Sequence, residues 1–378
     1  MSIGVAVLGS TGSIGRSALA VIARHPDRFR VVALAAHQRA RELDAQIQEF
    51  QPEFAVMVDE ASADRCMSRV SVGPEAVLAA ASHPAVDVVI NAVVGAAGLE
   101  ASLAALGAGK RLALANKESL VAGGALVLDA LQLGGGELIP VDSEHSAILQ
   151  CLHGSKQARR LILTASGGPF RSFDRAQLAQ VTAEQALRHP TWDMGAKITI
   201  DSATLVNKAL EVIEGHFLFG MPYDAIEVVV HPQSIVHSMV EFVDGSMLAQ
   251  LGFPTMELPI LYALTHPERV CDDGARPFDP VAAAALTFEP LDAERFPAFA
   301  LGIQAGRTGG TMPAVYNAAN EVAVELFLKQ QIGFPEIARV IETVLEAHSP
   351  GPADTLDQVL GADRWAREAA AHAAKVRT

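Results

Sequence analysis

Two carboxylates, Asp142 and Glu144, stand one residue apart at the end of an apolar run, 137–142, that predicts a strand. Residues two apart in a strand point to the same face, so we expect these side chains to lie together. Neighbouring carboxylates repel each other unless a cation or a proton lies between them, and their oxygens suit a divalent metal ion. The alternative is an ordinary cap at the strand end, and spacing does not decide between the two.

A second polar group lies in the segment 199–219, which we interpret as a strand (197–201), a turn and a helix. Ser202 would stand near the helix start, where free N–H groups and the helix dipole attract anions. Asn207 and Lys208 follow within two turns. This pattern predicts a phosphate site.

Glu211 is four residues after Asn207 and three after Lys208, so the three side chains can share one helical face. Glu211 could then reach a metal ion held by the same ligand, or simply form an ion pair with Lys208. Glu214 lies near that face as well, and spacing leaves the choice between the two glutamates open. Ser166, in a Ser-Gly-Gly-Pro turn after another predicted strand, offers a second hydroxyl, although such a sequence is also an ordinary turn.

A glycine-rich segment, 9–15, reads Gly-Ser-Thr-Gly-Ser-Ile-Gly directly after the first predicted strand and opens a predicted helix. Such a turn lets backbone N–H groups approach a pyrophosphate, which predicts a dinucleotide site. The strand that follows ends in Ala-Ala-His-Gln-Arg, without the Asp or Glu that holds the ribose of NAD. Arg39 therefore favours the 2'-phosphate of NADP, with a solvated surface arginine as the alternative.

The elements that must position these residues follow two patterns. Up to residue 143, short and almost continuously apolar strands alternate with amphipathic helices such as 16–24, which predicts an α/β fold with a doubly wound parallel sheet. The expected strands are 5–8, 30–36, 54–59, 86–94, 111–116 and 137–142.

Beyond residue 143 the pattern becomes α+β, with strands expected at 160–165, 197–201 and 226–230 and a hairpin turning at Asp244-Gly245. The chain then looks wholly helical, with helices at 314–328, 335–346 and 356–376. We predict a dinucleotide-binding domain (1–143), a central domain (144–270), a connector (271–297) and a C-terminal helical bundle (298–378).

Composition excludes several classes of function. The net charge of −14 argues against nucleic-acid binding, and the longest apolar runs contain glycines and polar residues, so no membrane span is expected. Cys66, Cys151 and Cys271 lie far apart, without the spacing of a zinc cluster or a disulfide framework. With the first strand beginning at Ile3, we expect no targeting peptide and a cytoplasmic protein.

Several motifs together resemble the 1-deoxy-D-xylulose 5-phosphate reductoisomerases. They are GSTGSIG (9–15), ANKESLV (115–121), VDSEH (141–145), TASGGPF (164–170), HPTWDMG (189–195), KITIDSATLVNKALE (197–211), HPQSIVHSMVEF (231–242) and NAANEVAV (317–324). The resemblance spans essentially the whole chain. It implies a Rossmann-like first domain, a central catalytic and dimerisation domain, a helical third domain, a homodimer, and NADPH-dependent rearrangement and reduction of 1-deoxy-D-xylulose 5-phosphate to 2-C-methyl-D-erythritol 4-phosphate in non-mevalonate isoprenoid synthesis.

The resemblance also implies roles for individual residues. It implies that Mg²⁺ or Mn²⁺ is bound by Asp142, Glu144 and Glu211, which with Lys117 form the catalytic group. The substrate contacts it implies are Ser166, Ser202, Asn207 and Lys208 at the phosphate, with Lys117, Ser143, Glu144, Glu211, His189 and Trp192, the last in a lid that could equally be a static loop. The NADPH contacts are Thr11, Gly12, Ser13, Ile14, Gln38, Arg39, Asn116, Glu118 and Gly195.

Some positions depart from the family pattern, among them Ala209, which stands where the family usually has glycine. His37-Gln38-Arg39 replaces a segment of glycine, a basic residue and asparagine, and Thr255 and Glu257 replace an acidic and a basic residue. Two rival functions remain. A simple NADP-linked aldehyde dehydrogenase would need a thiol nucleophile, for which no cysteine is well placed, and a silent NADPH-sensing module would not need the carboxylates and the phosphate site.

Overall fold

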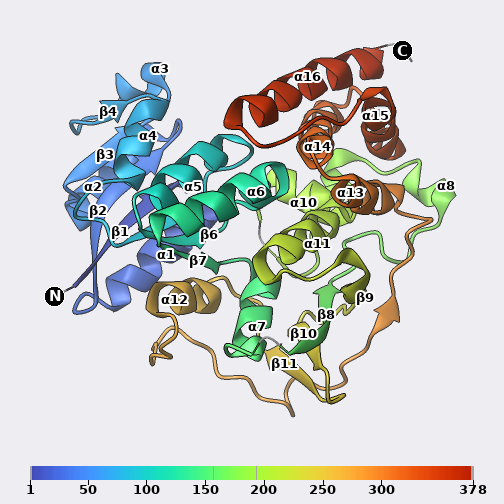
Figure 1. Cartoon of the computed structure of the whole chain (residues 1–378), viewed down its shortest axis with the longest axis horizontal. Helices are drawn as coiled ribbons and strands as arrows, with labels where there is room; N and C mark the ends of the chain where they lie inside the picture. Colours follow the sequence, from blue (N-terminus) through green and yellow to red (C-terminus); the bar gives the residue numbers. More distant parts are fainter. Residues whose placement is uncertain (1, 156, 193, 376–378) are drawn as a thin grey trace. The chain divides into compact units, whose positions relative to one another are not determined.

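The computed structural model describes residues 2–155, 157–192 and 194–375 (Figure 1). Val376, the last residue of the predicted terminal helix, lies outside the described residues. The chain forms two compact units. Unit 1 consists of Met1–Ser119, Val127–Ser146 and Thr255–Arg276, and unit 2 of Leu120–Leu126, Ala147–Pro254 and Pro277–Thr378.

Unit 1 is built on a parallel sheet with the strand order β4-β3-β2-β1-β5-β6-β7. The strands are β1 Ile3–Leu8, β2 Phe29–Ala36, β3 Phe54–Met57, β4 Ser71–Val72, β5 Val88–Asn91, β6 Arg111–Leu114 and β7 Glu137–Pro140. The central strands are buried almost throughout, as their apolar sequences require. The predicted doubly wound α/β fold is confirmed, and the two-residue β4 was too short to predict.

The helices of unit 1 include one from a distant part of the chain. They are α1 Ser13–Arg24, α2 Ala40–Phe50, α3 Glu60–Ala63, α4 Pro74–Ala81, α5 Ala97–Gly107 and α12 Glu257–Thr265, while α6 Lys117–Gly134 and α7 Ser143–Leu152 have residues in both units. Helix α12 packs against α1. Arg24 bridges to Glu257 (2.6 Å) and Asp272 (2.7 Å), so the unusual Glu257 anchors α12 to the helix that follows the glycine-rich turn.

The predicted strand 137–142 is too long. Strand β7 ends at Pro140, and α7 begins at Ser143, where the N–H of Ser146 donates to the Asp142 carbonyl at 2.8 Å. Asp142 is therefore the residue before a helix and Glu144 belongs to the first helical turn. The expectation that strand spacing places these carboxylates on one face is wrong.

Unit 2 contains a mixed sheet with the order β11-β10-β8-β9-β12. Its strands are β8 Ala158–Ala165, β9 Ile226–Val230, β10 Val236–Phe242, β11 Met247–Leu251 and β12 Glu289–Pro290, with only β8 and β9 parallel among these pairs. The predicted hairpin is confirmed, because Gly245 has a φ of +84° and its N–H donates to Phe242 at 3.0 Å.

The helices of unit 2 form a large apolar core around Tyr316. They are α8 Arg175–Leu178, α9 Ala183–Ala186, α10 Ala196–Ala203, α11 Val206–Phe219, α13 Pro297–Thr308, α14 Met312–Leu328, α15 Phe334–Ala347 and α16 Leu356–Lys375, with a 3₁₀ turn at Tyr223–Ala225. The helical C-terminal part is confirmed, and α13 was not predicted. Across the described chain, no helix combines the length and the apolar character needed to span a membrane.

The predicted strand 197–201 is wrong, because these residues lie in α10. Their β-branched side chains favoured a strand, but α10 packs against α11 and α14, and tertiary packing overrides a weak local propensity. Ser202 accordingly lies in the last turn of α10. A break follows at Leu205, with a φ of +60°, before α11 begins.

Candidate functional site

The glycine-rich turn joins β1 to α1, as predicted. Gly9 has a φ of +81°, and a Cβ on Gly15 would lie 2.3 Å from the Gly9 carbonyl oxygen, so a side chain fits at neither position. Gly12 caps α1 without a side-chain hydrogen bond, so no N-cap side chain occupies the N–H groups at the start of the helix. This geometry suits a pyrophosphate.

Arg39 lies beside this turn, after the end of β2. Its Nη1 donates to the carbonyl oxygen of Thr11 at 2.8 Å, while Gln38 is exposed and precedes it. Gln46 on α2 was not predicted to belong to this region. Its buried Nε2 donates to the Ser10 carbonyl at 2.9 Å and so helps to hold the turn.

Asn116 and Glu118 lie where β6 leads into α6, at the carboxyl edge of the sheet. Asn116 is the N-cap residue of α6 and its side-chain oxygen accepts from the Ser119 N–H at 2.9 Å. Its Nδ2 donates to Glu118 Oε2 at 2.8 Å, and both side chains are buried. The order of β1, β5 and β6 in the sheet brings these residues to the same edge as the glycine-rich turn.

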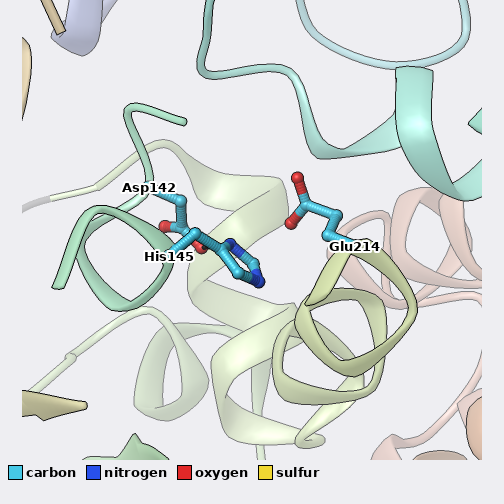
Figure 2. Close-up of side chains that lie close together, drawn as sticks. All are labelled: Asp142, His145 and Glu214. Atoms are coloured by element: carbon cyan, nitrogen blue, oxygen red, sulfur yellow. Dashed lines mark ion pairs between the residues drawn. The ribbon is translucent and has the colours of Figure 1, made fainter. Parts of the chain in front are cut away.

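Lys117 and Asp142 form a buried ion pair within unit 1. Lys117 Nζ lies 2.5 Å from Asp142 Oδ2. His145 Nδ1 lies 3.2 Å from the same oxygen, and Figure 2 shows these two side chains next to each other. Burial alone would raise the pKa of the Asp142 carboxyl, but Lys117 and His145 outweigh it and hold that pKa well below its usual range. Asp142 is therefore ionised at neutral pH, and its carboxylate has the chemistry of a cation ligand.

Side chains that could bind a cation lie in both units of the described chain. Unit 1 offers Asp142, Glu144 and His145, and α11 of unit 2 offers Glu211 and Glu214. Figure 2 draws Asp142, His145 and Glu214. His145 was not predicted. Its position three residues after Asp142 would have indicated it, had α7 been expected to start at Ser143.

Asn207, Lys208 and Glu211 share one face of α11, as their spacing predicted. Asn207 Nδ2 donates to Glu211 Oε1 at 2.6 Å, and the Lys208 ammonium pairs with Glu211 Oε2. The side chains of Lys208 and Glu211 are only 5% and 1% exposed. The ion pair considered as an alternative role therefore exists, but it is buried, and a buried pair costs more to desolvate than a surface pair.

The Ser-Gly-Gly turn after β8 lies directly against α10. A Cβ on Gly168, whose φ is +67°, would lie 2.9 Å from the Ser202 carbonyl oxygen, so glycine allows the turn and the helix to approach closely. Ser166 Oγ lies 3.1 Å from His189 Nε2. The structure thus brings the segments of Ser166, His189 and Ser202 together within unit 2.

His189 also holds the loop that carries Trp192. Its Nδ1 accepts from the backbone N–H groups of Thr191 (3.1 Å) and Trp192 (2.9 Å), which leaves the proton of the neutral ring on Nε2. Burial lowers the pKa of His189, which favours this neutral form. Trp192 is partly exposed and its ring lies 6.5 Å from that of His237, while Gly195 is the N-cap residue of α10.

Asp201 is a buried charge that sequence reasoning missed. It pairs with Lys197 at 2.9 Å and accepts a hydrogen bond from Asn320 Nδ2 at 2.8 Å, which links α10 to α14. The interpretation of 197–201 as a strand concealed this i, i+4 pair.

Comparison with known proteins places these features in one family. Three family models match the chain: 1-deoxy-D-xylulose 5-phosphate reductoisomerase at residues 5–124, and two C-terminal domains of the same enzyme at 138–219 and 251–369. The chain is 53% identical to the 1-deoxy-D-xylulose 5-phosphate reductoisomerase of Thermosynechococcus vestitus, over 96% of this chain and 90% of the relative. It is also 53% identical to that of Symbiobacterium thermophilum, over 98% of both.

Two similar solved structures extend the comparison. One is the Zymomonas mobilis reductoisomerase in complex with NADPH, with 43% identity, a TM-score of 0.91, and coverage of 99% of this chain and 100% of that one. The other is a DOX-P reductoisomerase in complex with NADPH, fosmidomycin and magnesium, with 39% identity, a TM-score of 0.94, and coverage of 99% and 98%.

Proposed function

Since the chain belongs to the 1-deoxy-D-xylulose 5-phosphate reductoisomerase family, it is an enzyme of isoprenoid precursor synthesis that uses NADPH and a divalent metal ion, and we propose which of its residues do this work. The enzyme converts 1-deoxy-D-xylulose 5-phosphate to 2-C-methyl-D-erythritol 4-phosphate. The buried face of α11 carries the proposal best, because Asn207, Lys208 and Glu211 place amide, cation and carboxylate together next to the helix start.

The residues of unit 1 fit NADPH. The tight turn excludes side chains at Gly9 and Gly15, and the free start of α1 suits the pyrophosphate held by Thr11, Gly12, Ser13 and Ile14. Gln38 and Arg39 would bind the adenosine end, and Asn116 and Glu118 would also contact the cofactor. We propose the same role for Gly195, which belongs to unit 2. When bound, NADPH supplies the hydride that reduces the rearranged aldehyde.

The carboxylates fit a hard divalent cation. Asp142 is ionised beside Lys117, and we propose that Asp142, Glu144 and Glu211 bind Mg²⁺ or Mn²⁺. The ion, when bound, acts as a Lewis acid that stabilises negative charge on the substrate oxygens. Lys117 keeps Asp142 deprotonated, and we propose that its ammonium also contacts the substrate as a member of the catalytic group.

The remaining groups hold the substrate. Lys208, Asn207, Ser202 and Ser166 bind the phosphate, whose binding energy keeps the small reacting part in register. His189, with its proton on Nε2, donates a hydrogen bond to the substrate in place of Ser166, and Ser143 adds a hydroxyl contact. Trp192 covers the substrate and excludes water.

The assay that tests the proposed function follows NADPH oxidation with 1-deoxy-D-xylulose 5-phosphate, with and without Mg²⁺. We expect turnover that disappears with chelator and returns with Mg²⁺. Metal-independent reduction of simple aldehydes, without turnover of the sugar phosphate, would instead support an ordinary dehydrogenase.

We predict that the enzyme prefers NADPH to NADH, because no carboxylate follows β2 and Arg39 lies at the glycine-rich turn. Arg39→Ala should weaken NADPH binding about tenfold or more, the scale of one charge-assisted hydrogen bond, and NADH binding much less. The two Kd values, measured by titration, check this. If the ratio of the Kd values for NADPH and NADH did not change in Arg39→Ala, a residue other than Arg39 would contact the 2'-phosphate.

We predict that the loop of Trp192 closes over the substrate. In a Trp365→Phe variant, which removes the other tryptophan, the emission of Trp192 should change when NADPH and a phosphonate substrate analogue bind together, because the partly exposed ring becomes enclosed. Constant emission at saturating concentrations of both ligands would indicate a static loop.

The oligomeric state, the division into domains and the cellular compartment are also proposals. We propose a homodimer, in which the edge strand β11, with Met247 and Leu248 about half exposed, offers backbone N–H and C=O groups for pairing with a second copy.

The division by function into residues 1–143, 144–270, 271–297 and 298–378 stays a prediction. Cys66, Cys151 and Cys271 form no disulfide within the described part of the chain, which suits a reducing cytoplasm, and the negative charge opposes nucleic-acid and anionic membrane surfaces.

A further inference from the structure

Two arginines in unit 1 meet at a single carbonyl oxygen. Arg16, in the first turn of α1, donates from Nη1 to the Thr11 oxygen at 2.9 Å, and Arg39, the N-cap residue of α2, donates from Nη1 to the same oxygen at 2.8 Å. The two helices thus bring two positive charges to one side of the glycine-rich turn.

No counter-anion balances these charges within the described part of the chain. Neither guanidinium forms an ion pair with a carboxylate there, and both side chains are exposed. A carbonyl oxygen carries only a partial charge, so the two like charges repel each other without full compensation. In a chain of net charge −14, such a pair is suited to an anionic ligand.

We propose that Arg16 and Arg39 form a two-arginine clamp for the 2'-phosphate of NADPH, and that Arg16 is a determinant of cofactor specificity. The proposal rests on the cofactor site proposed above. In a doubly wound fold the ribose lies beyond the end of the second strand, and Arg39 follows β2 there. Each guanidinium has five N–H groups, so each keeps donors for phosphate oxygens after one N–H binds Thr11.

The Thr11 carbonyl orients both side chains before the cofactor arrives. An arginine that is already held in place loses less side-chain freedom when it binds phosphate, which increases its contribution to affinity. The cofactor carries a second phosphate group to which Arg16 could bind, its pyrophosphate. The N–H groups at the start of α1 already suit that group, so Arg16 is free to bind the 2'-phosphate.

The test measures the Kd values of NADPH, NADH, 2',5'-ADP and 5'-AMP for the full-length protein and its Arg16→Ala variant by calorimetric titration. We expect Arg16→Ala to weaken NADPH and 2',5'-ADP about tenfold or more, and NADH and 5'-AMP less than about twofold. Arg16→Lys, which keeps the charge but loses the planar fork, should fall in between.

Arg41→Ala is the matched control, because it removes an exposed positive charge two residues after Arg39 without touching Thr11. It should leave all four Kd values nearly unchanged. Equal weakening of NADPH and NADH by Arg16→Ala would assign Arg16 to the pyrophosphate and overturn the clamp. An unchanged NADPH affinity in Arg16→Ala, with a loss in Arg39→Ala, would also overturn the clamp and leave the proposed cofactor site standing.

Discussion

Glu211→Gln should lower kcat by at least about a thousandfold at saturating Mg²⁺, because a metal ion contributes several kcal/mol of charge stabilisation that depends on its ligands. Steady-state kinetics over a range of Mg²⁺ concentrations measure this loss. The variant should still bind NADPH with unchanged Kd, since the glycine-rich turn belongs to unit 1. Its Tm should fall, because the buried Lys208 loses its charged partner.

Glu214→Gln is the control for this variant. Glu214 lies on the same helix, one turn later, and is also buried, so the two substitutions disturb packing in a similar way. If Asp142, Glu144 and Glu211 are the ligands, Glu214→Gln keeps Mg²⁺-dependent activity. Loss of activity in Glu214→Gln, with substantial activity in Glu211→Gln, would assign the metal to Asp142, His145 and Glu214 instead.

Lys208→Ala should lower kcat/KM for 1-deoxy-D-xylulose 5-phosphate about a hundredfold, because a buried ammonium makes a strong charge-assisted hydrogen bond to phosphate. Lys208 also pairs with Glu211, so part of the loss could come through the proposed metal ligand. Ser202→Ala separates the two effects. It leaves the ion pair intact and should raise KM about tenfold with little change in kcat.

Lys329→Ala provides the comparison for a lysine outside the site. Lys329, the C-cap residue of α14, also pairs with a glutamate of that helix, Glu325, but both side chains are more than half exposed. The Lys329→Ala substitution should leave kcat and KM unchanged, since exposed pairs of this kind contribute little.

If Ser202→Ala and Lys208→Ala bound inorganic phosphate as tightly as the wild-type protein, the phosphate site would lie elsewhere.

Most of unit 1 could be predicted from the sequence because its strands and its glycine-rich turn are specified by patterns of neighbouring residues. Strands buried on both faces must be apolar along their length, and GSTGSIG directly after the first of them is typical of a tight turn that opens a helix. The helical spacing of Asn207, Lys208 and Glu211 was likewise sufficient to place them on one face, as their hydrogen bonds confirm.

Local propensity failed where long-range packing decided the structure. The segment 197–201 contains β-branched residues typical of a strand, yet it forms α10, because packing against α11 and α14 and the Asp201–Asn320 hydrogen bond outweigh small intrinsic preferences. Residues 255–270 were predicted to belong to the central domain, but α12 packs on α1 and the Arg24–Glu257 pair ties it to unit 1.

By itself, the sequence determined the fold class, the glycine-rich turn and the residue types available for a metal ion and a phosphate, because periodicity and spacing act over a few residues. Only the tertiary structure decided which charges meet. His145 and Lys117 reach Asp142 from two segments, and Arg16 and Arg39 reach Thr11 from two helices. The Lys117–Asp142 and Arg39–Thr11 contacts join residues distant in the chain, and electrostatic interactions depend on distance and burial in space, which no local pattern records.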